Sequence, residues 1–262
     1  MFTLTAAGGW FPGSGGDKVR AAAAHGFGAV ELLCWKDLDL AETRRAIDET
    51  GTVISAILIQ SRDPEKQKWI DNTRGIVHEQ ARAAYLDAMA ETVEAARVLG
   101  VKNIVVTTGN ERAGVPRAVQ HANVVQALRA SAPMLEAAGM TAVLEPLNIL
   151  VDHRGYFLTA TAEAAAIIDE MQSPAVRVLY DVYHQQITEG NLISTIRQYI
   201  DRIGHIHVGD VPGRKEPGTG EINYRNVFRA IRDTGYTGFV VFECGLSEDA
   251  DTVCRKMWAL LD

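Results

Sequence analysis

Four side chains that can bind a metal ion each follow an apolar run in the second half of the chain. Glu145 ends the run in AVLEP, Asp181 lies in VLYDVYH, His207 lies in HIHV and Glu243 ends the run in VVFEC. An unpaired charge directly after a buried strand is costly. Because a shared divalent cation would offset that cost, the four residues together predict a metal site.

The predicted ligand set indicates which metal it would suit. Three carboxylates and one imidazole are rich in oxygen and contain no thiolate. Such a set suits a hard or borderline divalent ion, with Mn²⁺ or Mg²⁺ favoured and Co²⁺ or Zn²⁺ as alternatives. The lack of cysteine in the set counts against a structural zinc site.

Each ligand candidate also has an ordinary structural explanation. A lone carboxylate at a strand end is usually a helix cap or part of an ion pair, and a lone buried histidine usually has a hydrogen-bond partner. The same pattern on four successive strands is much less expected from those explanations. A structural role is favoured for His205, which precedes His207 by two residues. Glu31, in VELL, either faces the cavity or makes a structural hydrogen bond, and the sequence does not decide between these two roles.

The elements that must position these residues follow a repeated pattern. Short β-rich runs alternate eight times with longer helical runs, which predicts a parallel sheet. Eight such units in about 250 residues fit a single (β/α)8 TIM barrel over residues 1–262, with the strand ends of one rim forming the active site. A doubly wound open sheet is the alternative, although no GxGxxG follows the first strand. The expected strands are 4–6, 29–33, 53–59, 103–107, 141–145, 176–181, 203–208 and 238–243.

The helical runs are expected over about 17–25, 41–50, 78–99, 116–138, 159–171, 191–199, 223–234 and 248–261. The segment 60–77, which contains Trp69, is expected to be a polar connection that serves as a lid or a subunit contact. Cys244 follows Glu243, so strand alternation directs it to the opposite face and favours packing over a role as nucleophile.

Composition limits the classes of function. The net charge of −7 argues against tight binding of nucleic acid, because such binding depends on Lys and Arg at phosphates. No apolar run reaches the roughly 18 residues that span a membrane, and the first residues lack the pattern of a signal peptide. The three cysteines, without CxxC spacing, indicate reduced thiols in a cytoplasmic protein. The sequence leaves open whether the protein forms a homo-oligomer.

The stretch Gly204–Tyr224, GHIHVGDVPGRKEPGTGEINY, runs from a strand into a polar loop and then into a helix. Together with LEPLN, YDVYHQQITEG and the glutamate of the last strand, it resembles the hydroxypyruvate isomerase branch of the sugar isomerase/epimerase superfamily, whose barrels are related to xylose isomerase. The resemblance is specific from Glu145 to Glu243 and only architectural over the first 140 residues.

The resemblance implies roles for individual residues. It implies that Glu145, Asp181, His207 and Glu243 hold one divalent metal and that the two glutamates also exchange the substrate proton. It further implies that His184 and Arg214 contact substrate oxygens. Glu221, in the same loop as Arg214, is a candidate for reading the substrate.

The first two loops contain the aromatic residues Trp10, Phe11 and Trp35. Contact with the substrate's carbon chain and plain packing in the loops are equally expected for them. Trp10 is retained as a candidate for substrate binding.

One position departs from the hydroxypyruvate isomerase pattern. Those enzymes typically read GHIQ at the seventh strand, whereas this chain has His207, as ketose 3-epimerases do. The expected reaction is therefore proton transfer through an enediolate on a small hydroxy-carbonyl compound, such as hydroxypyruvate, a related sugar acid or a ketose. The chain is expected to be an aldose–ketose type isomerase, with a ketose 3-epimerase as the alternative.

Three other functions are known for barrels of this kind or are compatible with them. An inosose-type dehydratase would share the metal and differ in having a leaving hydroxyl. A DNA-repair endonuclease of the same barrel type is disfavoured, because AILIQSRD and VVTTGN lack the histidines that its zinc cluster needs and the chain is acidic. A sugar-binding barrel without catalysis is disfavoured by the paired glutamates Glu145 and Glu243.

Overall fold

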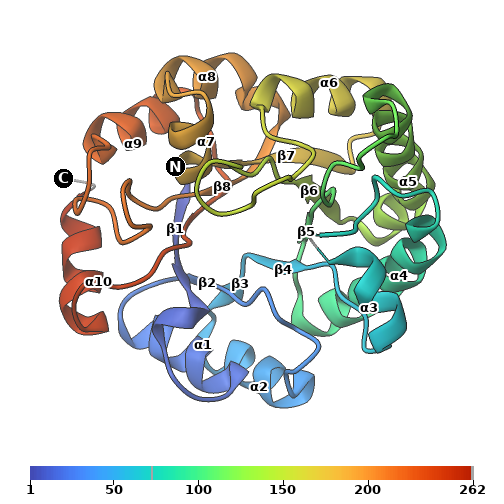
Figure 1. Ribbon diagram of the computed structural model, residues 1–262. Helices are drawn as coiled ribbons and strands as arrows, with labels where there is room; N and C mark the ends of the chain where they lie inside the picture. The colour runs from blue at the N-terminus through green and yellow to red at the C-terminus, as the bar shows by residue number, and fades with distance from the viewer. Residues whose placement is uncertain (72, 261–262) are drawn as a thin grey trace.

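Short parallel strands line the centre of the molecule and helices surround them (Figure 1). The computed structural model describes residues 1–71 and 73–260. Its strands are β1 (Thr3–Ala7), β2 (Ala29–Glu31), β3 (Val53–Ile54), β4 (Ala56–Leu58), β5 (Asn103–Val106), β6 (Thr141–Leu144), β7 (Val176–Asp181), β8 (Ile203–His207) and β9 (Phe239–Phe242).

The strands form one sheet in the order β3-β2-β1-β9-β8-β7-β6-β5-β4. Only Ser55 separates β3 from β4, so these two segments are parts of the single third strand that the sequence predicts. Because β3 pairs with β2 and β4 pairs with β5, that interrupted strand brings the two edges of the sheet together. The prediction of a TIM barrel is therefore confirmed.

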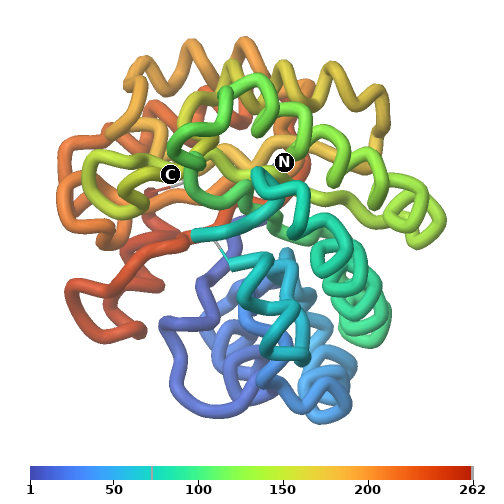
Figure 2. Tube along the Cα trace, turned by 45° about the vertical axis from the view of Figure 1, so that its right-hand side comes forward, coloured from blue at the N-terminus to red at the C-terminus, as the bar shows by residue number. Residues whose placement is uncertain are grey.

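The helices pack around the outside of the sheet. In both views α1 and α2 lie side by side, at the N-terminal, blue end of the colour scale (Figures 1 and 2). The helices are α1 (Gly15–Ala24), α2 (Leu40–Thr50), α3 (Pro64–Ile70), α4 (Ala81–Leu99), α5 (Arg117–Ala138), α6 (Thr161–Met171), α7 (Val182–Thr188), α8 (Leu192–Tyr199), α9 (Tyr224–Asp233) and α10 (Ala250–Ala259), with short 3-10 turns at Gly8–Trp10 and Ile200–Arg202.

Side chains alternate between the two faces of each strand, and the alternation separates two cores. Ile104, Leu144 and Val178 belong to the large core between strands and helices. Their neighbours Val105, Val143 and Leu179 form a second small cluster with Ala56, packed with Leu33 and Leu58. Two residues after Val143 and Leu179, on the same face of their strands, come Glu145 and Asp181. The equivalent positions at the ends of β8 and β9 hold His207 and Glu243. All four side chains therefore point into the mouth of the barrel.

Two helices fall in segments that the sequence analysis treats as loops. α3 lies within the predicted connection 60–77, where Asp63 caps the helix by accepting from the amides of Glu65 and Lys66, and Pro64 takes the first helical position. α7 begins directly after Asp181, whose side chain accepts from the amides of Tyr183 and His184. The predicted end of the last helix at Leu261 lies outside the described residues.

Among residues 1–71 and 73–260, no helix is both long and apolar enough to cross a membrane.

Candidate active site and metal centre

Four neighbouring strands bring Glu145, Asp181, His207 and Glu243 to the same rim of the barrel. One ligand atom from each lies within 4.8 Å of the others. Asp181 and His207 face each other in the register of β7 and β8. Glu145 and Glu243 each follow the last residue of their strand, β6 and β9. The side chains selected from the sequence thus lie together, within mutual reach of one cation.

The free atoms of this cluster fit a cation. Glu145 Oε1, Asp181 Oδ2 and His207 Nδ1 are buried and have no hydrogen-bond partner in the described structure. The other oxygen of Asp181 accepts from the amide of Tyr183 at 2.8 Å. Buried polar atoms normally have partners, so three such atoms turned toward one another mark a place for an ion.

Glu31 fixes the orientation of His207. The Nε2 atom of His207 lies 3.1 Å from Glu31 Oε2, while Nδ1 lies 3.2 Å from Glu243 Oε2 and 3.7 Å from Glu145 Oε1. A hydrogen bond from one ring nitrogen to a carboxylate sets which nitrogen is free to bind a metal. His207 is therefore positioned to offer Nδ1 to the cluster.

His205 also binds Glu31, through Nε2 at 2.9 Å, and its Nδ1 meets the Asn103 side chain at 3.2 Å. These contacts fit the structural role expected for His205. Burial acts to raise the pKa of Glu31, but His207 and His205 lower it below its usual value. Glu31 is therefore an ionised carboxylate shared by two histidines.

The two glutamates of the cluster lie in different electrostatic surroundings. Burial raises the pKa of Glu145, and the nearby carboxylate of Glu243 adds to that effect. Burial also acts to raise the pKa of Glu243, but His207 and Arg214 outweigh it and lower the pKa. A pair of carboxyl groups whose pKa values are driven apart in this way suits one proton donor and one proton acceptor.

Arg214 covers the cluster from the loop after β8. Its Nη2 donates to Glu243 Oε2 at 2.6 Å and lies 3.6 Å from Asp181 Oδ2. The guanidinium stands 5.0 Å above the ring of Tyr183, and Arg214 has a left-handed backbone with φ of 50°. Arg214 and Glu243 keep 28% and 25% of their side-chain area exposed, against 1% for Asp181. Arg214 and Glu243 are thus much more open to solvent than Asp181.

His184 is held as a neutral hydrogen-bond donor. Its Nδ1 accepts from the Asn148 side chain at 2.7 Å, which leaves the proton on Nε2. That Nε2 atom is buried, has no hydrogen-bond partner among the described residues and lies 3.5 Å from Asp181 Oδ2. Burial lowers the pKa of His184 to about 4. At neutral pH His184 therefore presents an N–H group to the cluster.

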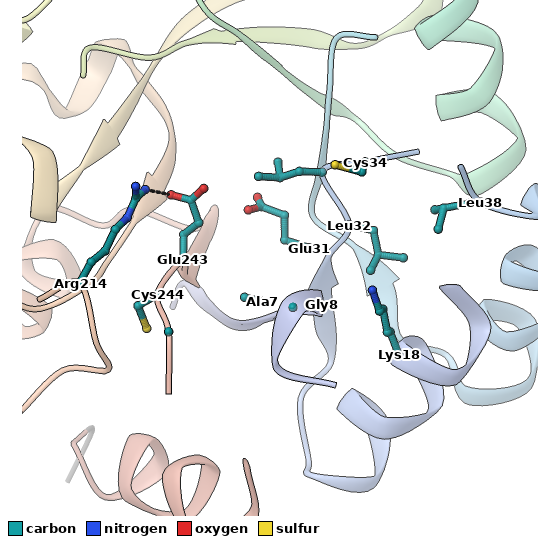
Figure 3. Close-up of a pocket in the computed structure, with 13 residues that line it drawn as sticks. Ala7, Gly8, Lys18, Glu31, Leu32, Cys34, Leu38, Arg214, Glu243 and Cys244 are labelled. Carbon is teal, nitrogen blue, oxygen red and sulfur yellow. Dashed lines mark hydrogen bonds and ion pairs between the residues drawn. The ribbon is translucent and has the colours of Figure 1, made fainter. Parts of the chain in front are cut away.

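Two cavities meet at the cluster and share Leu33, Arg214 and Glu243. One has a volume of about 300 Å³ and reaches Glu145, His153 and His184, with Gln67, Ile70 and Asp71 of the segment 60–77 in its wall. The other, of about 430 Å³, extends from Arg214 and Glu243 to Lys18 and Leu38 on the side of α1 and α2 (Figure 3). The expected lid segment thus contributes to a cavity wall.

Two predicted substrate-binding residues lie elsewhere. Glu221 is exposed and accepts from Gln186 at 3.2 Å, on a separate hollow beside α8 and α9. Trp10 is buried, donates from Nε1 to the Cys244 carbonyl at 2.8 Å and stacks on Phe242. Neither residue lines the two cavities at the cluster. Phe11 and Trp35 are likewise buried in the core.

Sequence reasoning did not single out Asn148, which sets the tautomer of His184 and also accepts from the amides of Val151 and Asp152. Its position three residues after Glu145, in LEPLN, was the available signal. It also missed Asp210, which is buried and shapes the loop of Arg214 by accepting from the amides of Gly218 and Ile222.

Comparison with known families agrees with this geometry. The model of the xylose isomerase-like TIM barrel family matches residues 19–257. The chain belongs to this family. Among its curated relatives, hydroxypyruvate isomerase of Escherichia coli K12 is 34% identical over 85% of this chain and 84% of its own length. A 2-oxo-tetronate isomerase of Cupriavidus necator is 33% identical over 86% of this chain and 84% of its own length.

Two solved structures superpose over nearly the whole chain. A family 2 AP endonuclease from Brucella melitensis has a TM-score of 0.88 at 25% identity and covers both chains completely. A D-psicose 3-epimerase, solved in the presence of D-fructose, has a TM-score of 0.77 at 20% identity over 97% of this chain and 89% of its own. The latter likeness shows the shared fold alone.

Proposed function

We propose that this chain is a divalent-metal-dependent isomerase that moves a proton between adjacent carbons of a small hydroxy-carbonyl compound. The relatives named above support an enzyme of the isomerase or epimerase type. The observation that carries the proposal is the meeting of Glu145 and Glu243 at one rim of the barrel, in one cluster with Asp181 and His207 that contains three buried ligand atoms without hydrogen-bond partners.

Glu145, Asp181, His207 and Glu243 would hold the metal, most favourably Mn²⁺ or Mg²⁺. When bound, such an ion supplies Lewis acidity to the carbonyl and hydroxyl oxygens of a substrate. The printed names of the relatives, hydroxypyruvate isomerase and 2-oxo-tetronate isomerase, favour a small keto acid as substrate.

The protein's own groups provide the proton transfers. Glu243 engages Arg214 and His207 through Oε2, so Oε1 is the atom that accepts a proton from the carbon beside the carbonyl. Glu145 turns Oε1 to the cluster, which leaves Oε2 to return a proton to the neighbouring carbon. The proton of the substrate hydroxyl passes to the carbonyl oxygen of the neighbouring carbon, so that the carbonyl moves by one carbon. His184 Nε2–H and the Arg214 guanidinium hold these two oxygens, where charge develops during the transfer. Glu243 then releases its proton to solvent and Glu145 regains one.

The test is a substrate screen in deuterated water. Metal-stripped protein is mixed with C3 to C6 hydroxy-aldehydes, ketoses or keto acids, with and without added Mn²⁺, Mg²⁺ or Co²⁺, and followed by proton NMR. We expect metal-dependent replacement of a carbon-bound proton by deuterium together with an isomerised product. If no compound of the panel incorporates deuterium with any of the metals, the proposal is rejected. A sugar-binding barrel without catalysis is then the favoured function.

A ketose 3-epimerase is the second candidate, because the metal ligand on β8 is His207 and the fold matches that of a ketose epimerase. In that reaction the proton returns to the same carbon from the opposite face. An inosose-type dehydratase would instead release a hydroxyl group. The NMR spectrum of the product separates the three: a moved carbonyl, an inverted carbinol centre, or a loss of water.

The contact between Glu31 and His207 leads to a prediction about metal affinity. Glu31→Gln removes the carboxylate that accepts from His207 Nε2, and we expect about 10- to 100-fold weaker binding of Mn²⁺. Calorimetric titration of the metal measures this without any substrate. The matched control is Glu221→Gln, an exposed glutamate outside both cavities, which should bind Mn²⁺ as the wild type does. Equal affinity in Glu31→Gln and the control would contradict the positioning role.

The cytoplasmic location and any oligomeric assembly stay predictions from the sequence.

A further inference from the structure

We propose that the larger cavity holds an anion subsite formed by Lys18, which binds the terminal carboxylate or phosphate of an acyclic substrate of four or more carbons. This inference rests on the proposed function, because the cavity begins at Glu243 and Arg214 of the candidate active site. In this inference the hydroxy-carbonyl group of the substrate binds at the metal cluster. The anionic group at the other end of its carbon chain lies toward α1.

The shape of the cavity favours a substrate longer than three carbons. Its volume of about 430 Å³ exceeds the volume of about 300 Å³ of the cavity that reaches Glu145 and His184, and it leaves room for carbons beyond those held at the cluster. Figure 3 shows Arg214 and Glu243 on one side, while Lys18 enters from α1 on the other, with its nitrogen directed toward Leu32. A three-carbon acid bound at the cluster would leave the Lys18 side empty.

The charges of the lining leave one cation unpaired. Four charged side chains line the cavity: Lys18, Glu31, Arg214 and Glu243. Glu31 is bound by two histidines, and Arg214 is bound to Glu243. The half-buried Lys18 ammonium forms no ion pair and no hydrogen bond with any residue in the described ranges 1–71 and 73–260. An ammonium in that position is a ready partner for a carboxylate or a phosphate.

Two glycines, Gly8 and Gly9, line the cavity. A Cβ atom at Gly8 would lie 2.4 Å from Leu32 Cδ2 and 2.8 Å from the Glu31 carbonyl oxygen, so no other residue fits there without a shift. Gly9 also lines the cavity, but a Cβ atom at Gly9 would meet nothing within 4 Å. Gly9 is therefore a position where a larger side chain can narrow the passage while the surrounding packing stays intact.

Lys18→Met is the direct test, with substrates that differ only at the end of the chain. Ribulose is neutral, ribulose 5-phosphate carries a phosphate on C5, and 2,3,5-trihydroxy-4-oxopentanoate carries a carboxylate in place of the C5 hydroxymethyl group, so all three present the same hydroxy-ketone to the cluster. We expect Lys18→Met to lower kcat/KM for one or both anions by about 10- to 100-fold, through KM, and to leave ribulose unchanged. The anion that suffers the larger loss identifies the natural end group, and Lys18→Arg should recover part of the loss.

Controls separate this inference from the proposed function. Lys102→Met removes an exposed lysine that does not line the cavity, and it should match the wild type for every substrate. Mn²⁺ affinity should be equal in all variants. Binding of ribulose 5-phosphate to the Mn²⁺-loaded protein, measured by calorimetry, tests the subsite even if no substrate turns over. Binding that depends on Lys18 without turnover would reject only the proposed reaction.

A second variant tests the passage itself. Gly9→Leu should weaken the binding of ribulose 5-phosphate by about tenfold or more, while binding of hydroxypyruvate, which has only three carbons, is unaffected. The subsite is overturned if Lys18→Met treats ribulose and both anions alike, or if wild-type protein binds neither anion more tightly than ribulose.

Discussion

Glu243→Gln is expected to lower the rate at which the substrate's carbon-bound proton exchanges with solvent by about 10²- to 10⁴-fold, the usual contribution of a positioned general base. The amide keeps the size of the side chain and an oxygen that can bind a metal, but it cannot accept a proton. Glu145→Gln removes the partner that returns the proton, so we expect a loss of similar size in product formation. Both rates are measured by proton NMR in deuterated water.

The two glutamine variants need a control for indirect effects on the metal. Mn²⁺ affinity is measured for each variant, and the assay is run with the metal in large excess over the measured dissociation constant. Glu221→Gln, an exposed glutamate paired with Gln186, is expected to exchange at the wild-type rate. Wild-type exchange in both Glu145→Gln and Glu243→Gln would remove these residues from the chemistry.

The sequence predicts the barrel, and it predicts that Glu145, Asp181, His207 and Glu243 meet at one rim, because both depend on local patterns. Alternation of apolar runs with helical runs is a property of each unit, and the topology of a barrel then brings all strand ends to one rim. Asp181 and His207 are 26 positions apart, yet parallel pairing of β7 and β8 makes them direct neighbours. A residue at the end of a barrel strand can therefore be placed before any contact is known.

Loop side chains could not be placed in the same way. Trp10 and Glu221 lie in segments without a regular repeat, so nothing in their spacing says which way the side chain turns. The structure shows Trp10 stacked on Phe242 and Glu221 turned toward α7. Arg214 does reach the cluster, and it does so with a left-handed backbone, a conformation that sequence patterns do not predict for arginine.

Contacts between residues far apart in the sequence could not be predicted either. Glu31 precedes His207 by 176 positions and holds it through the barrel interior. Lys18 looks like an ordinary surface residue of a first helical turn until α1 is seen to border the cavity. The roles of both residues depend on which element lies opposite them in the closed barrel. That arrangement cannot be predicted from a local segment of the sequence.

Metal affinity is expected to fall by about 100-fold or more when the pH is lowered from 7 to 5. Burial raises the pKa of Asp181 to about 6, and Glu243 adds to the rise while Arg214 and His207 oppose it. Burial acts to lower the pKa of His207, but Glu31 and Glu243 raise it well above 6.5. Below these pKa values protons occupy the atoms that a metal needs, so affinity must rise with pH as the protons leave.

The size of the effect follows from the two groups. Asp181 alone gives about a tenfold change between pH 7 and 5, since about nine in ten molecules carry its proton at pH 5. His207 contributes at least as much again, because its pKa is higher. Calorimetric titration with Mn²⁺ at several pH values measures the affinity, and repeating it in buffers of different ionisation enthalpy counts the protons released.

Asp181→Asn separates the two contributions. The asparagine oxygen can still face the cluster but has no proton to lose, so this variant should bind Mn²⁺ more weakly at pH 7 and should show a pH dependence that is shallower by about one proton. The carboxylates, His207, His184 and Arg214 around it remain in place. A wild-type affinity that is the same at pH 5 and pH 7 would show that the metal does not replace protons at this cluster, and that it binds elsewhere or not at all.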